Sequence, residues 1–98
     1  MNQRPDFHPD AKLEMREAAD YYDAQRTGLG SEFLDAIEAA MLQIIEHPES
    51  APVSMQPVRK HEVERFPFSV MYSVRDGDIF VSAVAHHSRR PYYWKDRL

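Results

Sequence analysis

Residues 68–86 decide the fold, and they read Phe-Ser-Val-Met-Tyr-Ser-Val-Arg-Asp-Gly-Asp-Ile-Phe-Val-Ser-Ala-Val-Ala-His. Asp76-Gly77 is a two-residue turn of the type that requires positive backbone φ, and apolar residues alternate with small or polar ones on both sides of it. This pattern predicts a β-hairpin with strands over 68–75 and 78–86.

The turn also predicts the register of this hairpin, with Tyr72 opposite Val81 and Val70 opposite Ala83. One face then carries Phe68, Val70, Tyr72, Val74, Ile79, Val81, Ala83 and Ala85. A slip of one residue would destroy this match, so the register is well constrained. The opposite face carries Ser69, Met71, Ser73, Phe80, Ser82, Val84 and His86. We expect this second face to be semi-polar and uncovered, and therefore to be the functional face.

The residues before the hairpin predict two helices that pack on its apolar face. The first helix is expected over 10–25, and the second from Leu29 or Ser31 to His47, where Pro48 stops it. Gly28 suits the turn between the helices, since glycine accepts the left-handed conformation of a helix cap. Residues 48–57 contain three prolines and are expected to be a loop, and 58–65 to be a weak strand. The fold class is α+β: an N-terminal antiparallel helical hairpin on a small curved antiparallel sheet, with residues 1–98 forming one domain.

The charges are divided unequally along the chain, whose formal net charge is -4. Residues 1–57 contain four Lys/Arg and eleven Asp/Glu, whereas residues 58–98 contain eight Lys/Arg and five Asp/Glu. The second part could therefore face an anion that the first part would repel. The sequence has no cysteine, no apolar signal core and no long apolar run. We therefore expect a cytoplasmic protein with no membrane partner.

The end of the chain concentrates the residue types that recognise phosphates and bases. His86 can transfer protons near neutral pH, Arg89 and Arg90 can bind a phosphate, and Tyr93 can act as an acid. The strand expected over 58–65 adds Arg59, Lys60 and Arg65 to the same surface. Such residues would suffice for RNA cleavage without a metal.

The same residues also have an ordinary structural interpretation. A histidine at the end of a strand is commonly a surface residue, terminal aromatics commonly close a small core, and arginines pair with acidic helices. The five histidines lack metal-ligand spacing and the chain has no glycine-rich phosphate loop, so we expect no metal and no cofactor. Residue chemistry alone leaves both interpretations open.

The order of motifs resembles the RelE/ParE toxin superfamily of type II toxin–antitoxin systems, which act in plasmid stabilisation. The resemblance rests on the segment Arg65-Phe66-Pro67-Phe68 before a strand and on the ending His86-x-x-Arg89-x-Pro91-x-x-Trp94. It extends from His8 to about Trp94 and implies two helices against a curved sheet, together with a cognate antitoxin that neutralises the protein.

The resemblance leaves two activities open. A ParE-like toxin would inhibit growth by binding a target such as DNA gyrase, and it would have no catalytic site. A RelE-like toxin would cleave mRNA on the ribosome, with His86, Arg89 and Tyr93 as catalytic residues. In either case Arg59, Lys60, Arg65, Arg89 and Arg90 would bind the target or its phosphates.

The His86-x-x-Arg89 ending and the acidic balance of the chain favour the ParE-like activity. His61, Glu62 and Glu64 also dilute the positive charge of the 58–65 strand, which a RelE-like nuclease would need. A third possibility is an inactive family member that only binds a partner. We expect the antitoxin to place an apolar helix or strand on exposed Met, Phe or Val positions of the sheet or helical hairpin. Its acidic residues would then meet Arg89 and Arg90.

Overall fold

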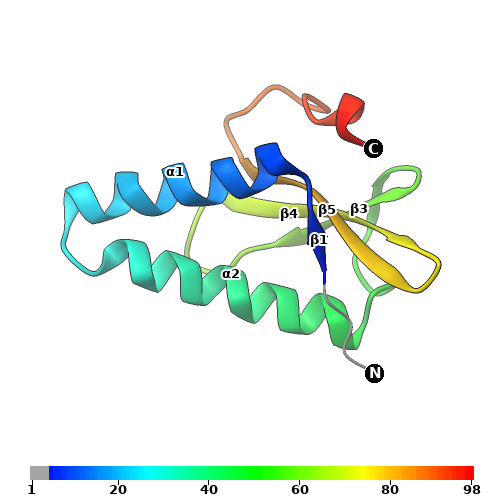
Figure 1. Cartoon of the computed structure of the whole chain (residues 1–98), viewed down its shortest axis with the longest axis horizontal. Coiled ribbons are helices and arrows are strands. Elements are labelled where there is room, and N and C mark those ends of the chain that lie inside the picture. Colours follow the sequence, from blue (N-terminus) through cyan, green and yellow to red (C-terminus); the bar gives the residue numbers. More distant parts are fainter. Residues whose placement is uncertain (1–4) are drawn as a thin grey trace.

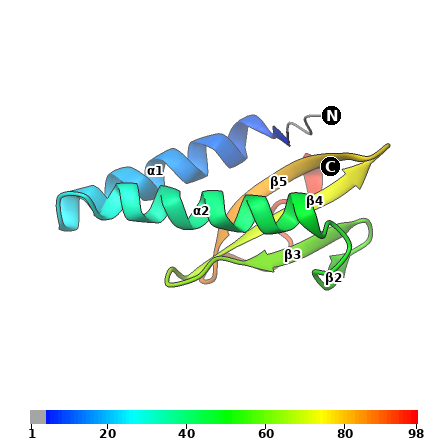
Figure 2. The same cartoon turned by 90° about the horizontal axis from the view of Figure 1, so that it is seen from below.

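The computed structural model describes residues 5–98 and shows two helices packed on a five-stranded sheet (Figures 1 and 2). The elements are β1 (Asp6–Phe7), α1 (Pro9–Gln25), α2 (Leu29–Glu46), β2 (Val53–Met55), β3 (Val58–Glu62), β4 (Phe68–Arg75), β5 (Asp78–His86) and the 3₁₀ helix η1 (Lys95–Arg97). The strand order is β1-β5-β4-β3-β2. The predicted α+β architecture is confirmed. The sheet is mixed, however, because β1 pairs with β5 in parallel while the other pairs are antiparallel.

The two helices begin and end close to the predicted residues. At the start of α1, His8 Nδ1 accepts a hydrogen bond of 3.0 Å from the Asp10 N–H, and Pro9 follows at the first helical position. Gly28 has φ +92°, as the turn between the helices requires. Asp23 at the end of α1 accepts hydrogen bonds from the N–H groups of Gly28 and Gly30, at 3.2 and 2.8 Å, and so ties the two helices together.

A β-bulge in β5 changes the predicted register of the central hairpin. Tyr72 pairs with Val81 as expected, but Met71 then pairs with Ala83, so Ser82 is the extra residue. From this point onward the prediction was wrong, because Val70 lies opposite Val84 and not opposite Ala83. The bulge turns Val84 toward the helices and turns Ala83 and Ala85 to the opposite face.

Each face of the sheet therefore has its own apolar cluster. The main core joins the helices to Phe68, Val70, Tyr72, Ile79, Val81 and Val84. The second cluster, which we call the outer cluster, contains Val58, Met71, Ala83, Ala85 and Trp94. Trp94 is only 3% exposed, so the expectation of an uncovered face was wrong. The chain after β5 covers this face, on the side of the sheet away from α2 (Figures 1 and 2).

The edge strands were not expected from the sequence. β1 has two residues, and β2 lies within the segment 48–57 that was expected to be a loop. The predicted strand over 58–65 ends at Glu62, and Arg65 has φ +73° in the connection to β4. Such short pairings contain too few residues to show alternation.

Candidate functional site

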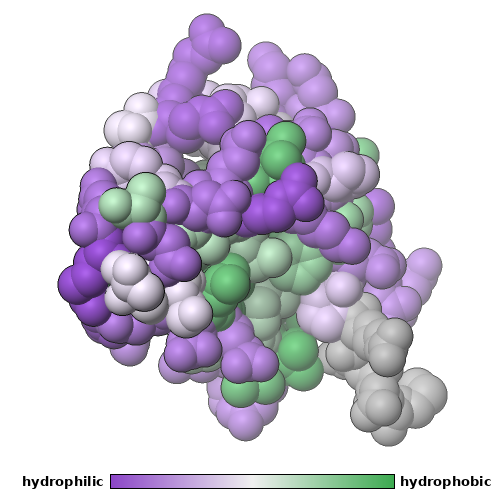
Figure 3. Space-filling model, turned by 60° about the vertical axis from the view of Figure 1, so that its left-hand side comes forward, coloured by the Kyte–Doolittle hydropathy of each residue, from purple (hydrophilic) through white to green (hydrophobic). Residues whose placement is uncertain are grey.

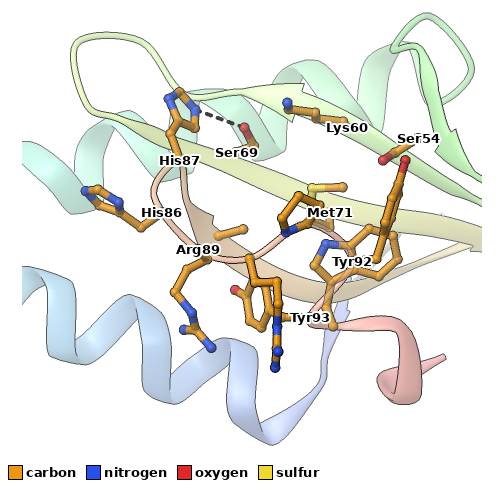
Figure 4. A pocket seen from close by; sticks show the side chains of 13 residues that line it. Ser54, Lys60, Ser69, Met71, His86, His87, Arg89, Tyr92 and Tyr93 are labelled. Atoms are coloured by element: carbon orange, nitrogen blue, oxygen red, sulfur yellow. Dashed lines mark hydrogen bonds between the residues drawn. The ribbon is translucent and has the colours of Figure 1, made fainter.

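The C-terminal segment, which we define as residues 87–98, forms a pocket together with β3, β4 and the end of β5. This C-terminal pocket has a volume of about 230 Å³ (Figure 4). Its lining includes five predicted site residues, Lys60, His86, Arg89, Arg90 and Tyr93. Ser54, Ser69, Met71, His87, Tyr92 and Trp94 also contribute to the lining. The structure thus brings most of the predicted cationic and aromatic groups to one place.

Glu14 on α1 connects the C-terminal segment to the rest of the protein. Its Oε2 accepts a hydrogen bond of 2.8 Å from the Tyr93 hydroxyl, and its Oε1 accepts one of 3.0 Å from Arg97 Nη1. The same Oε1 accepts the backbone N–H of Val84 at 3.0 Å. The guanidinium of Arg89 lies 3.6 Å from Oε2. A carboxylate that is only 12% exposed therefore faces two guanidinium groups.

Tyr93 is held on two sides and is poorly suited to donate its proton to a substrate. The Arg89 guanidinium lies 3.8 Å from the centre of its ring, which is a close cation–π contact. Burial, the hydrogen bond to Glu14 and the charge of Glu14 raise the pKa of the Tyr93 hydroxyl well above its ordinary value. A general acid works best with a pKa near the working pH, and Tyr93 is far from that condition.

The two histidines at the end of β5 have different partners. His86 Nδ1 accepts the Ser88 N–H at 3.0 Å, and its ring packs on Phe68 with the centroids 5.0 Å apart. His87 Nε2 lies 3.1 Å from Ser69 Oγ, as Figure 4 shows by a dashed line, and 2.9 Å from Glu62 Oε1.

Glu62 lies beside the C-terminal pocket, where it contacts the lining residues Lys60, Ser69 and His87 without lining the pocket itself. Burial opposes its ionisation, but the Ser69 hydrogen bond and the charges of Lys60 and His87 outweigh burial and lower its pKa. Lys60 Nζ lies 3.6 Å from Glu62 Oε2, so this predicted phosphate-binding lysine of the pocket is partly neutralised by a carboxylate outside the lining.

Two of the predicted arginines lie outside the C-terminal pocket. Arg59 Nη1 donates to the carbonyl oxygens of Glu49 and Ala51, at 2.9 and 2.7 Å, and so fastens β3 to the preceding loop. Arg65 Nη2 donates to Glu32 on α2 at 2.8 Å. The proposed role of each in binding a phosphate stays a prediction.

Arg90 differs from the other predicted arginines because it has no ion-pair or side-chain hydrogen-bond partner within residues 5–98. It is exposed at the rim of the pocket. Within the same range, no three His, Asp or Glu side chains are close enough together to hold a metal ion.

Comparison with known proteins decides the family. The model of the ParE toxin of type II toxin–antitoxin systems, parDE, matches residues 6–91. The chain belongs to the ParE toxin family. The predicted RelE/ParE membership is thereby confirmed. A search of curated protein sequences finds no significant match.

Two solved structures share the fold of this ParE-family toxin. One is the chromosomal ParDE toxin–antitoxin system from P. aeruginosa, with 18% identity, a TM-score of 0.63 and coverage of 86% of this chain and 95% of that one. The other is a mutant of the E. coli toxin RelE in complex with an antitoxin RelBc peptide. It has 20% identity, a TM-score of 0.65 and coverage of 98% and 95%. At this identity the similarity concerns the fold.

Sequence reasoning missed Glu14, whose carboxylate contacts three residues of the C-terminal segment, Arg89, Tyr93 and Arg97. Its place in the first half of α1 suggested only a favourable interaction with the helix dipole. The partners of Glu14 lie 70 to 83 residues away, so no local pattern could reveal them.

No helix within residues 5–98 has the length and apolar character that crossing a bilayer requires.

Proposed function

We propose that this ParE-family toxin inhibits growth by binding a protein target, for which DNA gyrase is the first candidate. The observation that carries the proposal is the internal use of two predicted phosphate-binding arginines and one predicted catalytic residue. Arg59 and Arg65 donate to the protein's own oxygen atoms, and the Tyr93 hydroxyl donates to Glu14. Catalysis of phosphoryl transfer requires preorganised cations and an acid aimed at the reacting group, and these three side chains are aimed elsewhere.

The charges in the C-terminal pocket also suit a protein target. Lys60 faces Glu62, Arg89 faces Glu14, and only Arg90 lacks a counterion among the described residues that line it. Two of the three Lys/Arg side chains that line the pocket thus have a carboxylate partner just outside the lining, and the third lies beside exposed Tyr92. One unpaired guanidinium of this kind suits an acidic side chain of a protein. An RNA strand carries a charge at every nucleotide and gains more from a row of unpaired cations.

We further propose that an antitoxin neutralises the protein, with acidic residues at Arg89 and Arg90. The exposed apolar residues narrow the surface that the antitoxin could cover. Met71 and Phe68 of the sheet are buried, although Val53 and Val74 of the sheet are exposed. The helices carry four exposed large apolar residues, Leu13, Tyr21, Leu34 and Leu42. Figure 3 shows apolar residues gathered in a recess that hydrophilic residues surround. The antitoxin would place its apolar segment on the helical hairpin.

The second candidate function is a RelE-like, metal-free endoribonuclease. It is favoured by one observation, namely that Lys60, His86, Arg89 and Arg90 line a single pocket. In this mechanism His86 would exchange the proton and the arginines would stabilise the phosphorane. The third possibility is a binding module without toxicity.

Inducible expression in a bacterial host separates the three. We would measure growth, mRNA integrity on translating ribosomes and plasmid supercoiling in the same cultures. Growth arrest with intact mRNA and altered supercoiling supports gyrase binding. Ribosome-dependent mRNA cuts support the endonuclease, and undisturbed growth supports the non-toxic module.

The matched variants are Arg90→Gln and Arg75→Gln. Arg75 is an exposed arginine at the far end of the hairpin, where it packs on Phe80. If Arg90 binds the target, Arg90→Gln should raise the inducer needed for arrest by about tenfold, since an interface arginine commonly contributes more than 1 kcal/mol. Arg75→Gln should leave it unchanged. Equal effects of the two variants would remove Arg90 from the target surface.

A further inference from the structure

The side chain of Glu14, on α1, reaches an edge of the sheet where β5 has no neighbouring strand. β1 pairs with β5 only at Phe80 and Val81, and the chain then leaves the sheet to enter α1. The edge of β5 beyond Ser82 therefore has no neighbouring strand, and an unpaired N–H at such an edge is costly when it is shielded from water. The Glu14 carboxylate accepts the Val84 N–H at this open edge.

The same carboxylate sets the position of Arg89. Glu14 Oε2 accepts the Tyr93 hydroxyl, and the Arg89 guanidinium lies against both the Tyr93 ring and Oε2. Arg89 is 49% exposed, and a long exposed side chain is free to rotate unless other groups hold it. The contacts with Tyr93 and Glu14 supply this restraint. Figure 4 shows Arg89 directed toward α1, the helix that carries Glu14.

Arg89 stands at the boundary between two concave surfaces. On one side lies the C-terminal pocket, and on the other lies a groove of about 380 Å³ beside α1, lined by Tyr21, Tyr22, Phe68 and Val84 among others. His86 also lines both. The orientation of Arg89 therefore determines what charge each surface presents to a partner.

We propose that Glu14 is the positioning residue of the functional surface: its carboxylate holds Tyr93 and Arg89 so that the guanidinium is presented in one orientation at this boundary. The proposal rests on the proposed function and extends it, because it adds Arg89, which lines the same pocket as Arg90, to the residues that contact the target. Glu14 itself is 12% exposed and is directed at the protein's own donors, so it acts through Arg89.

Glutamine cannot replace Glu14 in this role, although it has nearly the same size. It has one acceptor oxygen in place of two, and its amide would direct N–H groups at donors. It also leaves the Arg89 guanidinium without a counter-charge, whereas Arg97 keeps Asp10 at 3.8 Å. In Glu14→Gln we therefore expect Arg89 to become mobile. Glu38→Gln is the matched control, because Glu38 is exposed on α2 and its side chain has no hydrogen-bond or ion-pair partner among residues 5–98.

The first measurement is ¹⁵N NMR relaxation of the Arg89 Nε–H group, which requires no target. The wild type and Glu38→Gln should show an ordered group, and Glu14→Gln a mobile one. An equally ordered Arg89 in Glu14→Gln would overturn the proposal. Because this readout is independent of toxicity, a wild-type protein that fails to arrest growth would count against the proposed function alone.

The second measurement is a double-mutant cycle of Glu14→Gln and Arg89→Gln, read as the inducer level that gives half-maximal growth arrest. Glu14→Gln alone should raise this level by about tenfold, which is a typical coupling between contacting residues. In the Arg89→Gln background, Glu14→Gln should not raise the inducer level any further. A purely structural role would instead reduce the yield of folded protein in both backgrounds and would give additive effects. Additive effects would overturn the proposal.

Discussion

Replacement of Trp94 by alanine tests whether the C-terminal segment is an integral part of the fold. Trp94 is 3% exposed and packs on Val58, Met71, Ala83 and Ala85. These four residues are small or medium in size, so they cannot fill the space that a missing indole leaves. Truncation of a buried tryptophan to alanine typically costs about 3–5 kcal/mol, which is a large part of the stability of a small domain.

The expected shift in thermal midpoint follows from the size of the protein. The entropy of unfolding is about 2.1 cal/mol/K per residue, which gives roughly 0.2 kcal/mol/K for this chain of 98 residues. A loss of about 3 kcal/mol therefore lowers the midpoint by about 15 °C. We would measure unfolding by circular dichroism in urea and by calorimetry.

The control is Tyr92→Ala, which removes an aromatic neighbour of Trp94 that is 47% exposed. This variant should lose about 1 kcal/mol or less, because exposed side chains contribute little. If Trp94→Ala lowered the midpoint by no more than Tyr92→Ala, the outer cluster would not stabilise the fold and our reasoning would be wrong.

Three further predictions concern single residues. Gly30→Ala should destabilise the protein by about 1–3 kcal/mol, because the new Cβ would clash with the Ala19 carbonyl oxygen and lie 2.8 Å from Asp23 Oδ1. Urea unfolding measures this loss, and a free energy of unfolding within error of the wild type would contradict it. The Glu62 pKa lies below its ordinary value of 4.5, so the stabilisation from its partners is complete above that pH and is lost as the pH falls through the folded-state pKa. Glu62→Gln should therefore flatten the acid side of a plot of thermal midpoint against pH, and an unchanged slope would refute this. The Tyr93 pKa is raised, so its contribution is complete below pH 10.0, the ordinary value, and is lost as the pH rises above it. Burial also raises the pKa of Tyr22 and of Tyr72, so spectrophotometric titration should show several tyrosines that ionise late, and Tyr93→Phe should show one fewer of them.

The parts of the fold that depend on local pattern could be predicted from the sequence. The apolar spacing of α2 and the Asp76-Gly77 turn each depend on neighbouring residues, and the structure contains both elements. The β-bulge at Ser82 could not be predicted, because alternation continues through Ser82-Ala83-Val84-Ala85 whichever residue is the extra one. Alanine is small enough for either face, so Ala83 and Ala85 did not mark the change.

The site could be predicted in its composition but only partly in its geometry. The cluster of Arg, His and aromatic residues after β5 indicated the right segment, and five predicted residues line its pocket. The charges of these residues said nothing about their partners. Arg59 and Arg65 were grouped with Arg89 because they are close in sequence to one another and share its charge, whereas each is bonded to an acceptor elsewhere in the molecule.

The bulge at Ser82 also determines which substitutions should vary together among homologous chains. Before the bulge, Ile79 and Val81 pack in the main core, and after it Val84 does so. Ala83 and Ala85 pack against Trp94 instead. Side-chain volumes at positions 83 and 85 should therefore covary with the side-chain volume at position 94. The volume at position 84 should covary with those of the helix residues that face the sheet. Two adjacent residues of one strand would thus belong to separate evolutionary units, and a homologue that lacks the extra residue should carry a different C-terminal segment.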